Sequence, residues 1–371
     1  MVFFLAKKAL LSILFKLLDN TLIKIDFDIH REMLRMTTTL HLIRASHLNP
    51  ILQYMHALSM PVESLLEQVG LNTEVLIEPN QLIIETKVWR LLEVIANEQH
   101  IVDLGTACTE KSSLLEYGEF IRLLLKADNL YQALQLLIHK MSLHNNKNLM
   151  WLEESDGYIW LCRPQYSYGK NTCRQIEQHM MSFMCLLIEY FTGPGWAPQK
   201  IKLQQSESQW VESSRFFKAA NIKSNNQYSA IAIEPQFLSD RSISHEIIMP
   251  LDLQVIPNDF VQSFKLLLKQ NYFGQAWLAE HIAENLEMSV RTLKRKLQTQ
   301  KTSLREVFDE VRFQQAQDLI EEGICDYDLL AEKLSYTHPN NFVRAFKRWS
   351  GITPREYIRL RNIELMNKRD Y

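Results

Sequence analysis

The spacing of apolar side chains predicts helices over the first part of the chain. Apolar residues recur three and four positions apart from Thr39 to about Gln135, which is the period of one helical face. One of these helices begins at Pro61, because proline fits the first turn, and it ends at Gly70. We interpret these stripes as the buried faces of a helical core.

The middle of the chain, about 148–240, mixes strands with one long helix. Residues 148–163 predict a β-hairpin, since two apolar runs flank an Asp-Gly turn. Residues 176–191 predict an apolar helix, which a Gly-Pro-Gly sequence ends. Two further strand candidates are 200–203 and 230–233. This pattern indicates an α+β domain.

Two segments outside these regions have weaker patterns. Residues 1–38 begin with an apolar run, but Lys7, Lys8 and Lys16 interrupt it, and no charge-free stretch approaches the roughly 20 residues of a spanning helix. We read 1–38 as an uncertain extension that an over-long start would explain, with a peripheral membrane helix as the alternative, and expect no stable membrane insertion. Residues 241–257 lack sustained periodicity and predict an interdomain linker.

The last hundred residues contain the most informative pattern, two successive helix-turn-helix signals. In the first, Ser289 is a natural N-cap that follows a turn at Glu287 and Met288. The inward side chains of its two helices are apolar: Leu278, Ile282, Leu286, Val290, Leu293 and Leu297. The outward face of its second helix is basic: Arg291, Lys294 and Arg295, with Lys296 at its side.

The second signal runs from Asp326 to Pro354 and has the same layout. Thr337 is expected to cap its second helix, and Pro339 fits the first turn. The inward side chains are mainly apolar: Leu329, Leu330, Leu334, Phe342, Ala345, Phe346 and Trp349. The exposed side chains are polar or basic: Asn340, Asn341, Arg344, Lys347 and Arg348.

A single helix is expected to connect the two signals. Ser303 and Glu306 match a capping box, and Gly323 supplies the stop. The predicted helix, 303–320, would be about 25 Å long at 1.5 Å per residue. A spacer of that size could hold two recognition helices on one side of a duplex, where successive major grooves lie about 34 Å apart.

Charge is segregated rather than abundant. The net charge is −2, so any nucleic-acid site must be a local feature. Acidic residues gather in 306–332, whereas basic residues gather in the two candidate recognition helices. Attraction to phosphate requires such segregation, and Arg and Asn can also pair with guanine and adenine edges. One basic amphipathic helix is usually a solvated face, but two in tandem favour DNA binding.

Composition argues against other classes. Apolar residues make up 46% and charged residues 23%, the balance of a folded globular protein rather than a disordered one. The sequence has no glycine-rich phosphate loop, catalytic serine motif or metal-ligand spacing, so we expect no enzyme activity, cofactor or metal site. The five cysteines form no C-x-x-C pair, which favours a cytoplasmic location. We interpret His139, His144 and His179 as structural.

On these motifs the chain resembles the AraC family of bacterial transcription regulators. Residues 282–297 look like the first helix-turn-helix of that family. Residues 341–357 look like its signature end, with Gly351 and Pro354 in the G-x-x-P turn. One departure is Ser335-Tyr336, where the family usually has Gly-Phe.

The upstream part, about 45–240, resembles the arabinose-binding-type N-terminal domain of one branch of that family. The resemblance implies an effector-sensing and dimerisation domain at 39–240, a linker at 241–257 and a DNA-binding domain at 258–371. The expected fold class is α+β and mostly helical: a mixed sensor domain, then an all-α domain with two helix-turn-helix units joined by a long helix. No ligand motif carries across, so the effector-binding residues stay unknown.

The resemblance also assigns roles to the exposed side chains. One recognition helix would enter a major groove with Arg291, Lys294 and Arg295. The other would enter the next groove with Asn340, Asn341 and Arg344. Weaker phosphate contacts would come from Lys296, Lys347 and Arg348.

The implied function is that of a sequence-specific DNA-binding transcriptional regulator, an activator that responds to a small-molecule effector. Its partners would be double-stranded promoter DNA, RNA polymerase and a second copy of the chain in a homodimer. Two alternatives stay open: a regulator that acts mainly through protein contacts, and an enzyme in the N-terminal half.

Overall fold

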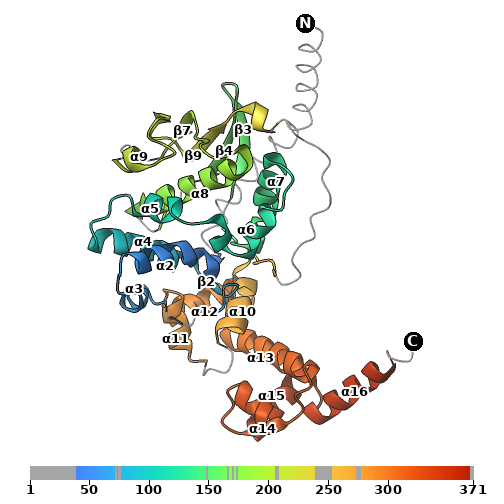
Figure 1. The fold of residues 1–371 in the computed structure, drawn as a ribbon. Helices are drawn as coiled ribbons and strands as arrows, with labels where there is room; N and C mark the ends of the chain where they lie inside the picture. Colours follow the sequence, from blue (N-terminus) through green and yellow to red (C-terminus); the bar gives the residue numbers. More distant parts are fainter. Residues whose placement is uncertain are drawn as a thin grey trace. The chain divides into compact units, whose positions relative to one another are not determined.

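A computed structural model describes residues 39–71, 73, 77–147, 149–164, 167–168, 171–172, 174–204, 209–238, 253–272 and 277–367 (Figure 1). The extension predicted at 1–38 lies outside these ranges, as does the linker predicted at 241–257 except for residues 253–257. The chain divides into two compact units, residues 1–256 and 257–371. Within the described ranges, no helix is both long and apolar enough to cross a membrane.

The N-terminal unit is mainly helical. Its helices are α2 (Asn49–Ala57), α3 (Val62–Gln68), α4 (Glu85–Glu98), α5 (Leu104–Glu110), α6 (Glu119–Leu124), α7 (Leu130–Lys140), α8 (Arg174–Thr192) and α9 (Gln209–Ser213). Its strands are β1 (Leu42–Arg44), β2 (Leu82–Ile84), β3 (Trp151–Ser155), β4 (Tyr158–Pro164), β5 (Ser167–Tyr168), β6 (Asn171–Thr172), β7 (Lys200–Lys202), β8 (Asn221–Lys223) and β9 (Tyr228–Ile233). Short 3-10 turns accompany them: η1 (Ala45–Leu48), η3 (Leu114–Tyr117), η4 (Met141–Leu143) and η5 (Pro235–Leu238).

Five strands form the main sheet of this unit, in the order β3-β4-β9-β7-β8. Neighbours are antiparallel except β7 and β8. In the β3–β4 hairpin Ser155 pairs with Tyr158, so Asp156 and Gly157 form a two-residue loop with φ of 53° and 77°. Positive φ at both positions matches the twist of the strands, and the predicted Asp-Gly hairpin is confirmed.

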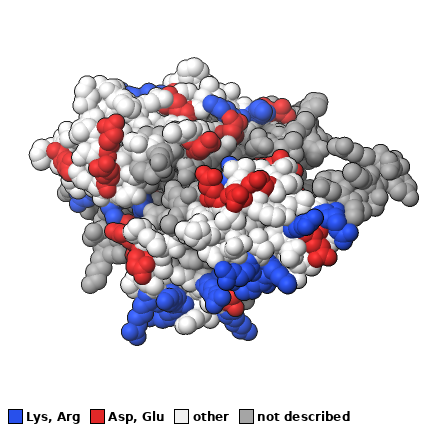
Figure 2. Space-filling model, turned by 90° about the horizontal axis from the view of Figure 1, so that it is seen from below, with Lys and Arg blue, Asp and Glu red and all other residues white. Residues whose placement is uncertain are grey.

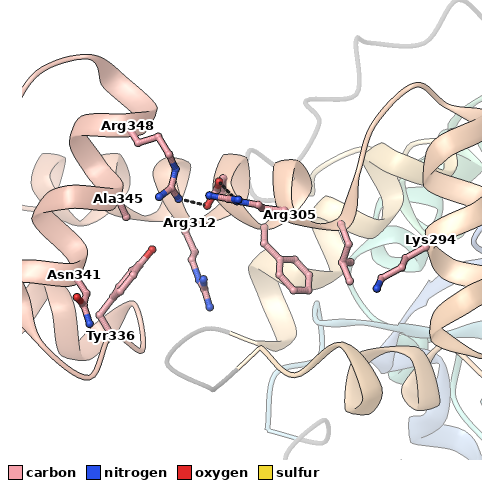
Figure 3. Close-up of a pocket in the computed structure, with 10 residues that line it drawn as sticks. Lys294, Arg305, Arg312, Tyr336, Asn341, Ala345 and Arg348 are labelled. Atoms are coloured by element: carbon pink, nitrogen blue, oxygen red, sulfur yellow. Dashed lines mark hydrogen bonds and ion pairs between the residues drawn. The ribbon is translucent and has the colours of Figure 1, made fainter.

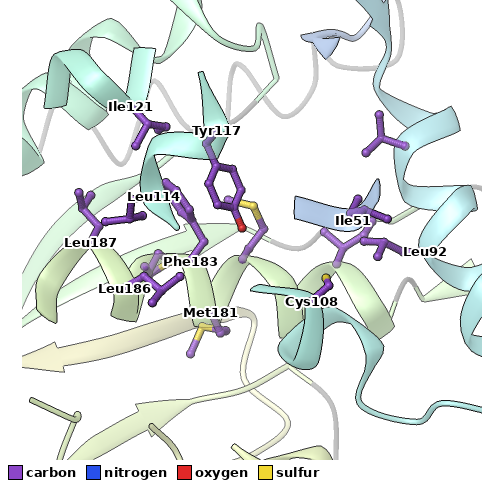
Figure 4. Close-up of a cluster of buried hydrophobic side chains, with 14 of the residues drawn as sticks. Ile51, Leu92, Cys108, Leu114, Tyr117, Ile121, Met181, Phe183, Leu186 and Leu187 are labelled. Carbon is purple, nitrogen blue, oxygen red and sulfur yellow. The ribbon is translucent and has the colours of Figure 1, made fainter. Parts of the chain in front are cut away.

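Helix α8 lies at the centre of the N-terminal unit. Every residue from Gln175 to Ile188 is buried, and the helix packs against α4, α5 and β9. A helix enclosed on all sides must be largely apolar around its whole circumference, which explains the long apolar run predicted at 176–191. Figure 4 shows its side chains interleaved with those of neighbouring elements: Met181, Phe183, Leu186 and Leu187 with Ile51, Leu92, Cys108, Leu114, Tyr117 and Ile121.

Gly105 allows α5 to approach α8 closely, and Gly105→Ala is expected to destabilise the N-terminal unit by about 1–3 kcal/mol. A methyl carbon there would lie 2.2 Å from the backbone oxygen of Gln175 and 3.0 Å from Cβ of Gln178. The two helices would have to separate, which outweighs the better helix propensity of alanine, about 1 kcal/mol. Urea unfolding followed by circular dichroism measures the change. Ala107→Ser, at a half-buried position on the same helix, is the control; equal stability of Gly105→Ala and the wild type would contradict the prediction.

The prediction of an uninterrupted helical region from Thr39 to about Gln135 is wrong at two places. Leu42–Arg44 and Leu82–Ile84 form the strands β1 and β2, which pair antiparallel. Each strand has three residues, all buried, so it shows no alternation of apolar and polar positions that a sequence pattern could detect.

In the described residues, the C-terminal unit is entirely helical, as predicted. Its helices are α10 (Phe260–Asn271), α11 (Ala279–Asn285), α12 (Val290–Thr299), α13 (Leu304–Glu321), α14 (Tyr327–Lys333), α15 (Pro339–Ser350) and α16 (Pro354–Asn367). Apolar side chains of α14 and α15, including Leu330, Phe342 and Phe346, pack against the second half of α13. Helix α13 packs also against α10 and α12, so the connecting helix lies at the centre of the unit.

Three predicted details of the helix-turn-helix units are wrong. Thr337 does not cap α15: the N-cap is His338, with φ −143° and ψ 139°, and no side chain accepts a capping hydrogen bond. The proline explains this in part, because a residue that precedes proline is driven to extended backbone and Pro339 starts the helix. The pattern predicts Leu278 and Leu329 inside, but these residues are 48% and 39% exposed. Both lie at or near the first turn of a short helix, where the inward face is incomplete.

Ser335→Gly is expected to stabilise the C-terminal unit by about 1 kcal/mol. Ser335 has a φ of 60°, which lies in the left-handed region. This conformation costs a residue with a Cβ about 1–2 kcal/mol. The buried hydroxyl oxygen of Ser335 also has no hydrogen-bond partner among the described residues. Glycine removes both penalties but loses part of the gain to the greater entropy of the unfolded chain. Thermal unfolding measures the shift, with exposed Thr337→Gly as the control; a lower melting temperature for Ser335→Gly would contradict this account.

Candidate nucleic-acid interface

Helix α12 presents a basic face because its apolar residues are directed inward. Ser289 caps the helix by accepting a hydrogen bond from the backbone N–H of Thr292 at 3.1 Å, as predicted. Leu293 and Leu297 are fully buried. The basic side chains around them are exposed: Arg291, Lys294 and Arg295. The helix therefore carries three cations that solvent can reach.

Lys296 differs from these three side chains. It is half-buried, and its ammonium nitrogen lies 5.1 Å from the centroid of the Phe260 ring on α10. Burial, and then the neighbouring charge of Arg295, lower the pKa of Lys296. The structure thus places Lys296 against the core of the unit rather than on the open face.

The first half of helix α15 presents two amides and an arginine on its exposed side. Phe342, Ala345 and Phe346 are buried, which leaves Asn340, Asn341 and Arg344 in solvent. The Arg344 guanidinium donates from Nη2 to Oδ1 of Asn341 at 3.0 Å, and from Nε to the backbone oxygen of Asn340 at 3.3 Å. These bonds hold Arg344 along its own helix, next to the two asparagines.

The remaining basic residues of α15 have different surroundings. Lys347 is exposed, whereas Arg348 donates from Nη2 to Oδ1 of Asp309 on α13 at 2.8 Å. Gly351 ends the helix with φ 80°, and its N–H donates to the carbonyl oxygen of Lys347. A glycine is suited to this left-handed C-terminal position.

The connecting helix α13 begins with the predicted capping box. The backbone N–H of Ser303 donates to Glu306 at 2.7 Å, and the backbone N–H of Glu306 donates to the Ser303 hydroxyl at 3.2 Å. Both bonds together fix the start of the helix. Its 18 residues span about 27 Å.

A groove of about 480 Å³ lies between the two recognition helices (Figure 3). Lys294 of α12 and Asn341 of α15 both line it, although they are far apart in sequence. The connecting helix contributes Arg305, Asp309 and Arg312 to it. Side chains predicted to read two different major grooves therefore open onto one shared concave surface.

Arg312 joins the two halves of the unit across α13. Its guanidinium carbon lies 4.7 Å from the ring centroid of Trp277 and 5.4 Å from that of Tyr336. Trp277 packs edge-on against Phe308 at 5.0 Å and donates from its indole nitrogen to the backbone oxygen of Tyr272. A cation held between rings of both halves restrains their relative orientation.

Sequence reasoning missed Arg305 and Arg312. Both lie on the connecting helix. Arg312 falls within the acidic stretch 306–332, so the distribution of charge along the chain did not indicate a basic site there. Only the helical spacing of Arg305, Asp309 and Arg312 could have indicated a shared face. Figure 2 shows several separate clusters of basic side chains on the face it draws, with acidic side chains beside some of them.

Comparisons with protein families match both units. The family described as a helix-turn-helix domain matches residues 282–360. The family described as the arabinose-binding domain of AraC transcription regulators matches residues 60–240. The chain belongs to the AraC family. Its order of domains, an arabinose-binding-type domain followed by a helix-turn-helix domain, agrees with the resemblance that the motifs indicated.

Curated relatives of this AraC-family chain match it over about a third of its length. An uncharacterized HTH-type transcriptional regulator of Mycobacterium tuberculosis is 31% identical over 34% of this chain and 38% of its own. The transcriptional regulator SirC of Salmonella typhimurium is 34% identical over 28% of this chain and 38% of its own. The HTH-type transcriptional regulator GadX of Escherichia coli is 30% identical over 34% of this chain and 46% of its own. The chain thus aligns with less than half of each of these relatives.

The N-terminal unit of this family member contains a row of buried polar side chains. Oγ1 of Thr109 lies 2.7 Å from Nδ1 of His179, whose Nε2 lies 3.0 Å from Nε2 of His47. Nδ1 of His47 lies in turn 3.1 Å from Nε2 of His144. His144 and His179 are buried, in agreement with their interpretation as structural histidines.

The cavity beside this row is too small for an effector. It has a volume of about 10 Å³, which is room for about one water molecule. Its walls include His47, Tyr117 and His144. Among the described residues, no group of three or more His, Cys, Asp or Glu side chains is arranged to hold a metal ion.

Proposed function

We propose that this protein is a transcription regulator that binds double-stranded promoter DNA with both helix-turn-helix units. The observation that carries the proposal is the shared groove, which Lys294 of α12 and Asn341 of α15 both line. In this proposal Arg291, Lys294 and Arg295 enter one major groove, and Asn340, Asn341 and Arg344 enter the next. Lys347 and Arg348 contribute charge nearer the phosphates, and Lys296, which is half-buried against Phe260, contributes more weakly.

The organisation of the chain follows from the same proposal. Residues 39–240 sense a small-molecule effector and mediate dimerisation, 241–257 link the domains, and 258–371 bind DNA. The match of 60–240 to an arabinose-binding-type domain supports a small-molecule ligand. Activation through RNA polymerase is the common outcome in the family, and the relatives named as transcriptional regulators support a role of this class.

A gel-shift titration of the full chain tests the proposal. The probes are a duplex from upstream of its own gene and a scrambled duplex, each at about 50 and 200 mM salt. Groove binding through several phosphate contacts predicts a selective shift whose affinity falls on the order of 10³-fold between the two salts. A weak, unselective shift with a shallow salt dependence would instead favour a regulator that acts mainly through protein contacts.

A further inference from the structure

Asp309 places a carboxylate in the middle of the basic groove. Its Oδ1 accepts from Nη2 of Arg348 at 2.8 Å, and its Oδ2 lies 3.9 Å from Nε of Arg305 (Figure 3). The Asp309 side chain is 21% exposed, whereas those of Arg348 and Arg305 are 49% and 75% exposed. One acid therefore faces two guanidinium groups that solvent can still reach, and it offsets at most one of their two positive charges.

The groove remains strongly cationic around this carboxylate. Four of the lining residues are basic: Lys294, Arg305, Arg312 and Arg348. Asp309 is the sole acid among the described residues that line it. A phosphate that enters the groove meets an excess of positive charge and one competing anion.

The position of the groove indicates which part of a duplex would reach it. Its two sides are the recognition helices α12 and α15, and its floor is the helix that connects them. Between two successive major grooves on one face of a duplex lies the minor groove, with a sugar–phosphate strand along each of its edges. Guanidinium groups bind phosphate oxygens in a bidentate manner and are well suited to that contact.

We infer that the floor of this groove is a phosphate site, in which Arg305 and Arg348 bind the DNA backbone and Asp309 is the counter-charge that the phosphate replaces. The inference rests on the proposed function. A partly exposed ion pair contributes little in water, so a phosphate can exchange with Asp309 at small cost. The acid thereby lowers affinity for every DNA sequence alike, which leaves discrimination to the base-reading side chains.

Removing this carboxylate is the direct test. In fluorescence-anisotropy titrations of the full chain, Asp309→Asn is expected to tighten binding about 3- to 10-fold, equally on a selected and a scrambled duplex. The plot of log affinity against log salt should steepen by up to about 0.9, the value for one phosphate contact. Glu310→Gln is the matched control, because Glu310 is the next residue, pairs with Lys265 and does not line the groove. The Glu310→Gln variant should tighten binding by less than about 2-fold.

Two arginine variants establish whether the guanidinium groups that face Asp309 bind the DNA backbone. Arg305→Gln, at a highly exposed side chain, should weaken binding to both duplexes equally and flatten the salt plot by about 0.9. Arg348→Gln should remove most of the gain from Asp309→Asn in the double variant. Melting curves establish that each variant is folded at the temperature of measurement.

The inference is overturned if Asp309→Asn behaves like Glu310→Gln, or if it weakens binding, since Asp309 would then act as general charge or as a positioning group. In either case a wild type that still binds selectively leaves the proposed function standing. A wild type that binds no duplex at all overturns both. The wild-type titration therefore separates the two claims.

Discussion

Replacement of Arg295 and Arg344 together by alanine is expected to weaken binding of the full chain to its selected duplex by about 30-fold or more, because each arginine lies on the exposed face of a different recognition helix. One base-reading arginine contributes about 1–3 kcal/mol, and distant sites add, so the pair accounts for about 2–6 kcal/mol. Both side chains are outside the core, so the melting temperature should not change.

The pattern of loss distinguishes base reading from phosphate contact. The affinity for a scrambled duplex should fall only slightly, because base-specific hydrogen bonds do not form with that sequence. Arg344→Ala alone should relax specificity at one base pair. Arg359→Ala, at an exposed site on α16, is the control and should leave sequence preference unchanged. Equal losses on both duplexes would show that Arg295 and Arg344 contact phosphate instead.

A fall in pH from about 7.5 to about 5.5 is expected to destabilise the N-terminal unit, because its buried histidines resist protonation. Burial lowers the pKa of His47 to about 3. Burial also lowers the pKa of His144, with His47 and Arg44 adding to the effect, and the pKa of His179, with His47 and Arg163 adding. The native state therefore keeps all three imidazoles neutral over this range.

The hydrogen bonds define how these neutral rings are arranged. The Thr109 hydroxyl donates to the carbonyl oxygen of Gly105, so it must accept from Nδ1–H of His179. His179 then accepts at Nε2 from His47, and His47 accepts at Nδ1 from His144. A second proton on His179 or His47 would replace an acceptor by a donor that faces another donor.

The sign of the effect follows from the lowered pKa values. The pKa of histidine in the unfolded chain is about 6.5. Below that pH the unfolded state therefore binds more protons than the native state. The stability that the three groups contribute is complete above about pH 6.5 and is lost as the pH falls toward their folded values. Each contributes at most about 1.4 kcal/mol per pH unit. Glu85, whose pKa burial raises, opposes this trend in part.

Urea unfolding at about pH 7.5, 6.5 and 5.5 measures the dependence. Between about pH 6.5 and 5.5, His144→Gln should reduce the loss of unfolding free energy by about one third, since one of three titrating groups is removed. His139→Gln is the control, because His139 is exposed and should leave the dependence unchanged. Stability that does not vary with pH, or that changes equally in both variants, would contradict this account of the buried row.

Local features of the fold were predictable because short-range rules determine them. The Asp-Gly loop, the Ser289 cap and the capping box at Ser303 each depend on residues no more than a few positions apart. The exposed faces of α12 and α15 follow in the same way from the spacing of buried residues such as Leu293 and Phe346.

The contacts that the sequence could not predict join distant residues. His47 and His179 are 132 positions apart, and only the fold around α8 brings them together. Arg348 and Asp309 are 39 positions apart, and their pairing depends on how α15 packs on α13. The exposure of Leu278 and Leu329 likewise depends on the length of α11 and α14, which periodicity alone does not determine.

In the proposed function, one chain reads two successive major grooves on one face of a duplex. Selection from random duplex DNA with the full chain, followed by hydroxyl-radical footprinting of the enriched sequence, tests it most directly. Two enriched and protected segments are expected, with their centres about 10 base pairs apart. A single short segment, or no enriched sequence after selection, would contradict it.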